Sequence, residues 1–194
     1  MNPAAIAAVF AQLDPEIWLV TARAGDRRGG LIATFVCQAS IVLELPRVVV
    51  GIARHHYTWE LVEASGAFGL HLLGEEQLEW VWRFGLESGR DFDKLAGLAT
   101  HTAATGSPLL TDALAWLDCR VEARFDTGDR TLYLAEVADG QRVGSAPPLT
   151  LKRLRQLAPP GRLCELGEQI KQDSIRDAEA IRRWRQHPPT HPAP

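Results

Sequence analysis

A pair of alternating segments in the second half of the chain constrains the fold most strongly. Apolar and polar residues alternate from Ala113 to Phe125, and a second apolar-rich run covers Thr131–Val137. A strand with one buried face has this period of two. The residues between the segments, 127–130, include Gly128 followed by an aspartate, which is typical of a tight hairpin turn. The pattern therefore predicts two antiparallel strands joined by a hairpin.

Other short runs rich in β-branched and aromatic residues predict further strands upstream of this hairpin. They cover residues 17–22, 29–40, 47–53 and 67–73. Helical spacing of apolar residues predicts helices over 2–13, 59–65, 75–84 and 162–186. Many strands with antiparallel hairpins and few helices predict a mainly β fold with α additions, and a small β-barrel in particular.

Length and composition limit the classes of protein to which the chain can belong. Its 194 residues with 46% hydrophobic content suffice for one core. We therefore expect one domain over residues 1–158 that includes the N-terminal helix. A C-terminal helical extension follows over 159–194, with a Pro-rich tail that frays from His187.

The net charge and the cysteine content limit the cellular compartment and the kinds of partner that we expect for the chain. The net charge of −3 does not indicate a basic surface for nucleic acid, and no apolar run is long enough to span a membrane. Cys37, Cys119 and Cys164 are widely spaced, which argues against a disulfide framework and against a CxxC metal site. A cytoplasmic, reduced protein without a metal is the expectation.

The run Gly29–Ser40 combines strand-forming residues with small ones. Ala33, Thr34 and Cys37 leave room for a flat ligand against the strand, much as glycine does, and the Thr34 hydroxyl can donate a hydrogen bond. One interpretation is a strand that supports one face of a cofactor. An ordinary buried strand is the alternative, and these residues alone favour it.

A second candidate site is the segment Arg54–Thr58. Thr58 is a plausible N-cap for the helix over 59–65, and Arg54 with two histidines lies just ahead of it. Free amides and positive charge at a helix N-terminus suit a phosphate. A solvated turn before a capped helix is the alternative. His55 and His56 lack a third ligand at a recognisable spacing, so a metal site is not indicated.

The order of these segments resembles the flavin reductase-like family of FMN-binding split barrels over residues 16–155. The resemblance rests on the series and not on one motif. Its members are the strand over 17–22, Gly30–Val36, Val48–Ala53 after Pro46, Tyr57-Thr58, the strand over 67–73, the aromatic helix, Leu114–Cys119 and Gly128–Tyr133.

The resemblance implies a homodimeric split β-barrel that binds FMN, or FAD in some members, near the subunit interface. By position, the implied flavin contacts are Leu31, Ile32, Ala33, Thr34, Val36, Cys37, Gly51, Ile52 and Ala53, with Arg54, Tyr57 and Thr58 at the phosphate and Arg83 or Phe84 at the end of the aromatic helix. No residue is assigned as an acid, a base or a nucleophile, because the flavin carries the chemistry.

The implied activity is NAD(P)H-dependent flavin reduction by hydride transfer, which supplies reduced flavin to a monooxygenase or another redox partner. Arg130 stands where many of these reductases carry a histidine near the nicotinamide. This difference fits an alternative function, an FMN-binding electron carrier without reductase activity of its own. A related split barrel that binds haem or a deazaflavin is a third and weaker hypothesis.

Overall fold

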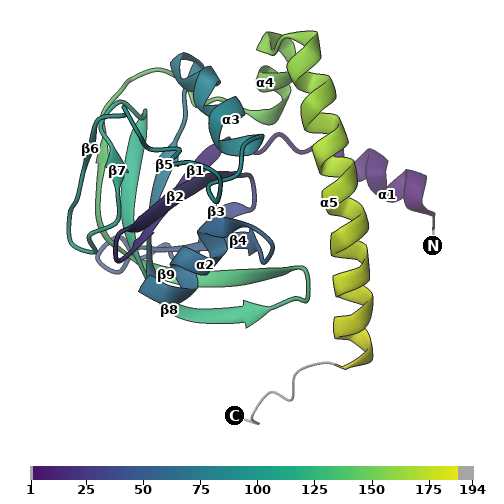
Figure 1. Cartoon of the computed structure of the whole chain (residues 1–194), viewed down its shortest axis with the longest axis horizontal. Coiled ribbons are helices and arrows are strands. Elements are labelled where there is room, and N and C mark those ends of the chain that lie inside the picture. Colours follow the sequence, from purple (N-terminus) through teal and green to yellow (C-terminus); the bar gives the residue numbers. More distant parts are fainter. Residues whose placement is uncertain (1, 188–194) are drawn as a thin grey trace.

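A seven-stranded antiparallel sheet dominates the computed structural model, which describes residues 2–187 (Figure 1). Its strand order is β2-β1-β5-β8-β9-β4-β3. The strands are β1 (Trp18–Ala24), β2 (Arg27–Ala33), β3 (Val36–Gln38), β4 (Arg47–Ala53), β5 (Ala67–Leu72), β8 (Ala115–Asp126) and β9 (Arg130–Arg142). Two short strands, β6 (Thr100–His101) and β7 (Leu109–Leu110), pair separately. The predicted mainly β fold with helical additions is confirmed.

The sheet is curled into a half-barrel, since a two-residue link joins its two edges and they must therefore lie close together. β2 pairs with β1 at one edge, and β3 pairs with β4 at the opposite edge. Residues 34 and 35 make this crossing, and the Phe35 carbonyl accepts a hydrogen bond from the Gly51 amide at 2.8 Å. The single strand predicted over 29–40 is therefore wrong. It is two strands, since its halves belong to opposite edges.

The central hairpin is longer than its sequence pattern indicates. β9 continues to Arg142, five residues beyond the predicted end at Val137. Two register shifts interrupt its pairing with β8, between Asp118 and Cys119 and between Val121 and Ala123. Such bulges bend a strand and increase its twist, which suits a curled sheet. They also interrupt the period of two on which the prediction relied.

Two groups of buried side chains hold the domain together. The first fills the barrel and includes Val20, Val50 and Phe68. The second lies between the start of β1 and the helices α3 (Leu78–Gly85) and α4 (Leu151–Leu157), and it includes Trp82 and Phe84. A short 3-10 turn, η1 (Glu75–Gln77), leads into α3. The aromatic residues of α3 thus pack within the chain.

The helix α2 (Tyr57–Ser65) begins before its predicted start. Its N-cap is His56, and no side chain caps its first amides. The prediction of Thr58 as N-cap is wrong, because Thr58 lies inside the first turn and is buried. The helix ends at Gly66, whose φ of +67° closes it in the left-handed conformation that favours glycine.

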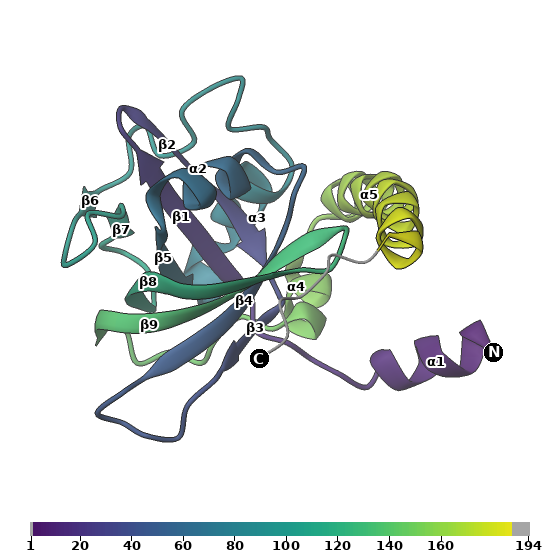
Figure 2. The same ribbon diagram turned by 90° about the horizontal axis from the view of Figure 1, so that it is seen from below.

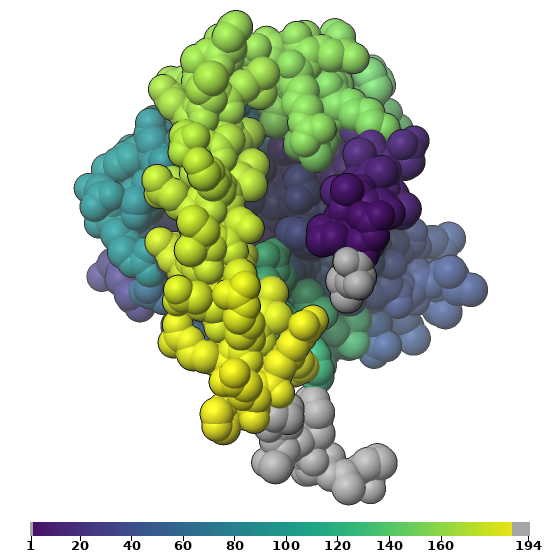
Figure 3. Space-filling view, turned by 90° about the vertical axis from the view of Figure 1, so that its right-hand side faces the viewer, coloured from purple at the N-terminus to yellow at the C-terminus, as the bar shows by residue number. Residues whose placement is uncertain are grey.

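The longest helix, α5 (Pro160–Gln186), runs past the half-barrel as a separate rod (Figures 1 and 2). None of its 27 residues is buried. Figure 3 shows it crossing one face of the molecule. The predicted C-terminal helix is confirmed, and the predicted fraying concerns a tail of which residues 188–194 lie outside the described residues.

The N-terminal helix α1 (Pro3–Phe10) projects away from the body (Figure 2). Asn2 caps it, because the side-chain oxygen of Asn2 accepts from the amides of Ala4 and Ala5. None of its residues is buried. Across residues 2–187, the helices are all too short or too polar to cross a bilayer.

Candidate functional site

A cavity of about 520 Å³ lies between the half-barrel and α5, and we call it the slot. Residues 31–35 and 51–53 form its floor, which is mostly backbone and small or apolar side chains of β2, β4 and the crossing segment. Residues 170–181 of α5 contribute the opposite wall, including Ile170, Ala178 and Ile181. A flat apolar ring fits between two such surfaces.

Arg130 lies at one end of the slot, and carboxylates hold its guanidinium. Its Nε donates to Asp129 at 2.5 Å and its Nη2 donates to Asp177 of α5 at 3.0 Å. The guanidinium lies 4.4 Å from the centre of the Phe35 ring. Burial raises the pKa of Asp177, although the charge of Arg130 opposes this. Arg130 is therefore a fixed part of the slot.

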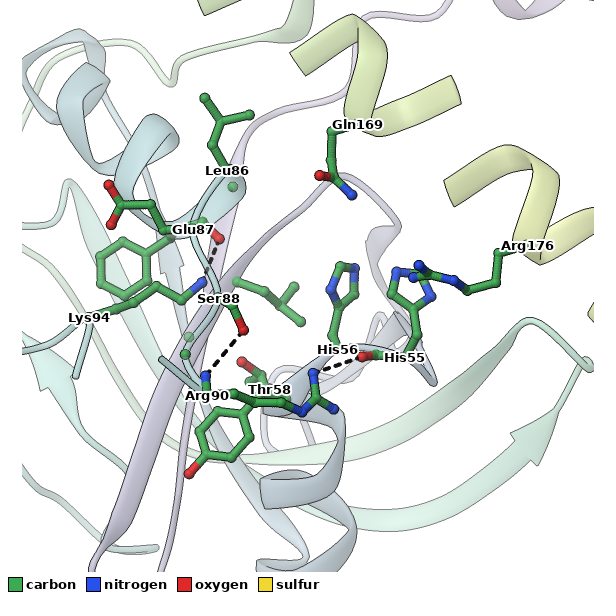
Figure 4. A pocket seen from close by; sticks show the side chains of 16 residues that line it. His55, His56, Thr58, Leu86, Glu87, Ser88, Arg90, Lys94, Gln169 and Arg176 are labelled. Carbon is green, nitrogen blue, oxygen red and sulfur yellow. Dashed lines mark hydrogen bonds between the residues drawn. The ribbon is translucent and has the colours of Figure 1, made fainter. Parts of the chain in front are cut away.

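A second cavity, of about 230 Å³, opens at the N-terminus of α2, and we call it the basic pocket (Figure 4). Arg90 and Lys94, from the loop after α3, and Arg176 of α5 line it. Thr58 and Ser88 also line it. Glu87 is the one carboxylate that the described residues contribute to this lining. Uncapped helix amides together with cationic side chains are typical of a site for a phosphate.

Lys94 is the most buried cation of this pocket. Its Nζ donates to the Phe84 carbonyl at 3.0 Å and lies 5.7 Å from the centre of the Phe84 ring. An ammonium group carries three protons, so further donors remain for a ligand. Burial lowers the pKa of Lys94 to about 8, which leaves the amine mostly protonated at pH 7.

The two histidines before α2 carry little charge at neutral pH. Burial lowers the pKa of His56 to about 4, and the neighbouring His55 adds to this shift. Burial also lowers the pKa of His55, which Asp173 of α5 opposes from 3.3 Å. The cations of the basic pocket at pH 7 are therefore Arg90, Lys94 and Arg176, of which Arg90 pairs with Glu60 and Arg176 pairs with Asp173.

The slot and the basic pocket adjoin each other. Leu31, His55 and His56 line both cavities. Figure 4 shows Gln169 and Arg176 reaching from α5 toward the two histidines. The arrangement is a cleft with an apolar part and a cationic part, which matches a planar ring that carries a phosphorylated chain.

The structure brings most of the predicted flavin contacts to this cleft. The predicted contacts that line the slot are Leu31, Ile32, Ala33, Thr34, Gly51, Ile52 and Ala53. Those that line the basic pocket are Tyr57, Thr58 and Phe84, and Leu31 lines both.

Four predicted contacts lie elsewhere. Arg54 donates to Asp126 at 2.9 Å and stacks over the Trp59 ring. Val36 and Cys37 line a different apolar cavity of about 450 Å³. Arg83 donates to the Ala96 carbonyl at 2.5 Å. A flavin role for these residues stays a prediction.

The sequence did not point to Ser88, Arg90 and Lys94, or to the face of α5. Two basic residues shortly after Ser88-Gly89 are a weak signal for an anion site. Nothing local indicates that this loop returns to α2, more than thirty residues earlier. Among the described residues, no group of three histidine, cysteine or acidic side chains is arranged for a metal ion.

Comparison with known proteins adds independent evidence. A family model described as the flavin reductase like domain matches residues 11–158. The chain is 32% identical over 142 residues to diflavin flavoprotein A 1 of Synechocystis, which covers 73% of the chain and 24% of that protein. It is 35% identical over 126 residues to the reductase subunit HsaB of a flavin-dependent monooxygenase from Rhodococcus jostii, covering 64% and 63%. The chain thus spans less than two thirds of either relative.

A third relative matches over more of its own length. The chain is 31% identical over 143 residues to a ferric-chelate reductase (NAD(P)H) of Archaeoglobus fulgidus, covering 73% and 83%. Among solved structures, nitrilotriacetate monooxygenase component B homologue from Mycobacterium thermoresistibile superposes with a TM-score of 0.67 at 25% identity, covering 81% and 89%. The NADH:FAD oxidoreductase SgcE6 of Streptomyces globisporus gives 0.68 at 21% identity, covering 77% and 90%, a likeness of fold.

Proposed function

The chain belongs to the flavin reductase-like family, and from this premise we propose that it binds FMN in the cleft and reduces it with NAD(P)H. One observation carries the proposal, namely that the slot and the basic pocket adjoin. The slot has the shape and apolar character for the ring, and the pocket has the donors for the phosphate. FAD is the alternative flavin.

The residues present fit a flavin nucleotide in their chemistry. The helix α2 has no side-chain acceptor on its first amides, and Arg90, Lys94 and Arg176 neutralise negative charge beside them. When bound, the flavin supplies two-electron hydride chemistry between the dinucleotide and an acceptor. The chain would orient the ring on the slot floor, place the Arg130 charge near it and limit the access of water.

An electron carrier without reductase activity is a second candidate function. The wall that α5 forms favours it, because a helix over the slot restricts the approach of a second ring. Rapid oxidation of NADH or NADPH with FMN present supports the reductase. Turnover no faster than that of free flavin supports the carrier.

We also propose a homodimer. α1 and the loop before β4 expose apolar side chains with no covering surface in the described part of the chain, as at Ile41, which is 95% exposed, and Leu43, which is 82% exposed. Apolar patches of this kind mark interaction sites. Sedimentation equilibrium at micromolar protein tests the proposal, and a monomer contradicts it.

The acceptor of the reduced flavin is proposed to be a monooxygenase or another redox protein. The named relatives include the reductase subunit of a flavin-dependent monooxygenase and a homologue of component B of nitrilotriacetate monooxygenase, which supports this. We place the protein in the cytoplasm, since its three cysteines are free thiols, as is usual in a reducing compartment.

The decisive experiment is spectroscopic. The purified protein is titrated with FMN, and its absorbance and fluorescence are followed. NADH or NADPH is then added without oxygen, and bleaching of the flavin band is measured. Saturable binding followed by bleaching faster than that of free FMN supports the proposal. A colourless protein that ignores FMN and FAD contradicts it.

A further inference from the structure

The helix α5 differs from the rest of the site in how it is attached. It follows the region that the family model matches, which ends at residue 158. None of its residues is buried, and Ile175 is 62% exposed. Ion pairs within the helix join Arg162 to Glu165 and Arg183 to Glu179, and such pairs stabilise a helix without help from a core. α5 can therefore remain helical whether or not it is docked.

Leu163 and Leu166 near the start of α5 pack on the second core group. Beyond them a small set of contacts holds α5 against the half-barrel, and we call this set the latch. Asp177 pairs with Arg130, and a carboxylate oxygen of Asp173 lies 3.3 Å from Nε2 of His55, which is an ion pair only when His55 is protonated. Further along the helix, the Trp184 ring packs edge-on against Phe125 with ring centres 6.4 Å apart.

Gly128 permits the close approach at this end of the latch. A Cβ atom at Gly128 would lie 2.6 Å from the Cβ of Trp184 and 2.9 Å from the Ala180 carbonyl oxygen. Only a residue without a side chain allows this approach, and the φ of Gly128, +95°, also favours glycine. The hairpin tip is thus shaped to receive α5.

The docked position of α5 closes the slot on the side away from the strands. Ile170, Ala178 and Ile181 line the slot opposite its floor, and Arg176 reaches the basic pocket. A ring on the strands would have α5 over its other face. A nicotinamide must lie face to face with the flavin ring for hydride transfer, and α5 occupies the space for it.

We propose that α5 is a closing wall of the flavin site, which the latch holds shut, so that release of FMN and entry of the nicotinamide both require α5 to swing out. This proposal rests on the proposed function. It assigns residues outside the family-matched region to the site, with Asp177 as a positioning residue that acts through Arg130. A bound flavin is then retained between catalytic cycles.

The test compares two variants that open the latch at different points with one matched control. Asp177→Ala removes the α5 carboxylate that pairs with Arg130 and leaves Asp129 in place. Trp184→Ala removes the distant docking contact and touches neither cavity. The control, Glu179→Ala, removes a carboxylate of the same helix whose ion pair, with Arg183, is exposed. Each full-length protein is loaded with FMN, and dissociation is followed by the recovery of FMN fluorescence after dilution.

Both latch variants should release FMN about tenfold faster than the wild type, the size expected for loss of one charge-assisted or well-packed contact. They should also be reduced faster by NADH without oxygen, while Glu179→Ala stays within about twofold. A faster release in Asp177→Ala alone would mean a direct contact with the flavin, and it overturns the closing wall. Unchanged release in both variants overturns it as well.

This outcome is separable from the proposed function. Binding of FMN by the wild type with unchanged release in the variants leaves the flavoprotein intact and removes only the closing wall. Absence of FMN binding by every protein removes both. Circular dichroism of each variant checks the fold, which should persist because α5 contributes no buried residue.

Discussion

The two sides of the cleft are built on different principles. The strand side is part of a hydrogen-bonded sheet, and Ile52 on its floor is 1% exposed and packs in the barrel core. The α5 side rests on ion pairs, one aromatic contact and the partly buried Leu163 and Leu166 near its start, and none of its residues is fully buried. A rigid surface positions a ligand, whereas a weakly attached one can move at small cost. The comparison indicates that the strand side of the site fixes the position of the ligand, whereas the α5 side controls its entry and release.

An isoleucine-to-alanine substitution on each side sharpens this comparison. The two variants should differ in the free energy of unfolding by more than any other pair that we propose. Ile52→Ala removes buried methyl groups from the barrel, so we expect a loss of about 2–5 kcal/mol in the free energy of unfolding. Ile175→Ala on α5 should change it by less than about 0.5 kcal/mol, because the side chain is exposed and alanine favours a helix. Urea denaturation of both variants measures the difference. Equal losses would mean that α5 is part of the core.

Acidification probes the strand side through His71. The ring is fully buried, its Nδ1 donates to the Leu19 carbonyl at 3.0 Å, and its Nε2 accepts from the Leu110 amide at 3.0 Å. This tautomer is neutral, and burial lowers the pKa of His71 to about 4. Because the folded pKa lies below the unfolded value of 6.5, the stabilisation is complete above pH 6.5 and is lost as the pH falls toward 4.

We expect the free energy of unfolding to fall by about 3 kcal/mol over this window from His71 alone, at 1.36 kcal/mol per pKa unit. His71→Gln should flatten the profile. His56→Gln should flatten it less, although the pKa of His56 is also about 4, since opening of α5 lets His56 protonate without unfolding the barrel. Denaturant titrations between pH 4 and 7 measure all three proteins. Equal flattening by the two variants would contradict an independent α5.

The basic pocket lies where the two sides meet, and Lys94 tests it. Lys94→Gln removes a buried donor and a charge, so FMN should bind more weakly by about 1–3 kcal/mol. Riboflavin, which has no phosphate, should bind as before. Isothermal titration of both flavins separates these effects. Equal loss for riboflavin would place Lys94 at the ring and not at the phosphate.

Arg54 supplies the comparison within this experiment. It remains a predicted phosphate contact, while its guanidinium is paired with Asp126. Arg54→Ala should leave FMN affinity nearly unchanged if that pair persists in solution. A loss as large as that of Lys94→Gln would mean that Arg54 turns into the pocket when FMN binds.

The sequence predicted the strand side of the site much better than the α5 side, for a physical reason. Alternation, glycine turns and β-branched runs are local signals, and they located β4, β5 and the start of the β8–β9 hairpin well. The floor residues Leu31–Thr34 and Gly51–Ala53 lie on or beside these strands, and the family resemblance implied them as flavin contacts. The break at residues 34 and 35 escaped prediction, because it depends on which sheet edge each half joins, and pairing of distant strands leaves no local mark.

The other side depends on contacts between distant parts of the chain. The fixed position of Arg130 depends on Asp177, which lies 47 positions later in the chain. Arg90 and Lys94 form a candidate anion site only because their loop lies against the N-terminus of α2. Helical spacing predicted α5 well, but a weak apolar stripe does not indicate which surface the helix packs against. The contacts that hold α5 are also weak, so a small change in free energy can break them.

The last prediction is a pH dependence of FMN affinity. The pKa of Lys94 is lowered to about 8 by burial, so the amine is largely charged at pH 7 and largely neutral at pH 9. A bound phosphate favours the charged amine and raises its pKa, so affinity should fall as the pH rises, by up to about tenfold from pH 7 to pH 9. Lys94→Arg keeps its charge throughout and should bind with nearly constant affinity. Fluorescence titrations at each pH check this, and a wild-type profile as flat as that of the arginine variant would show that the charge of Lys94 does not contribute to binding.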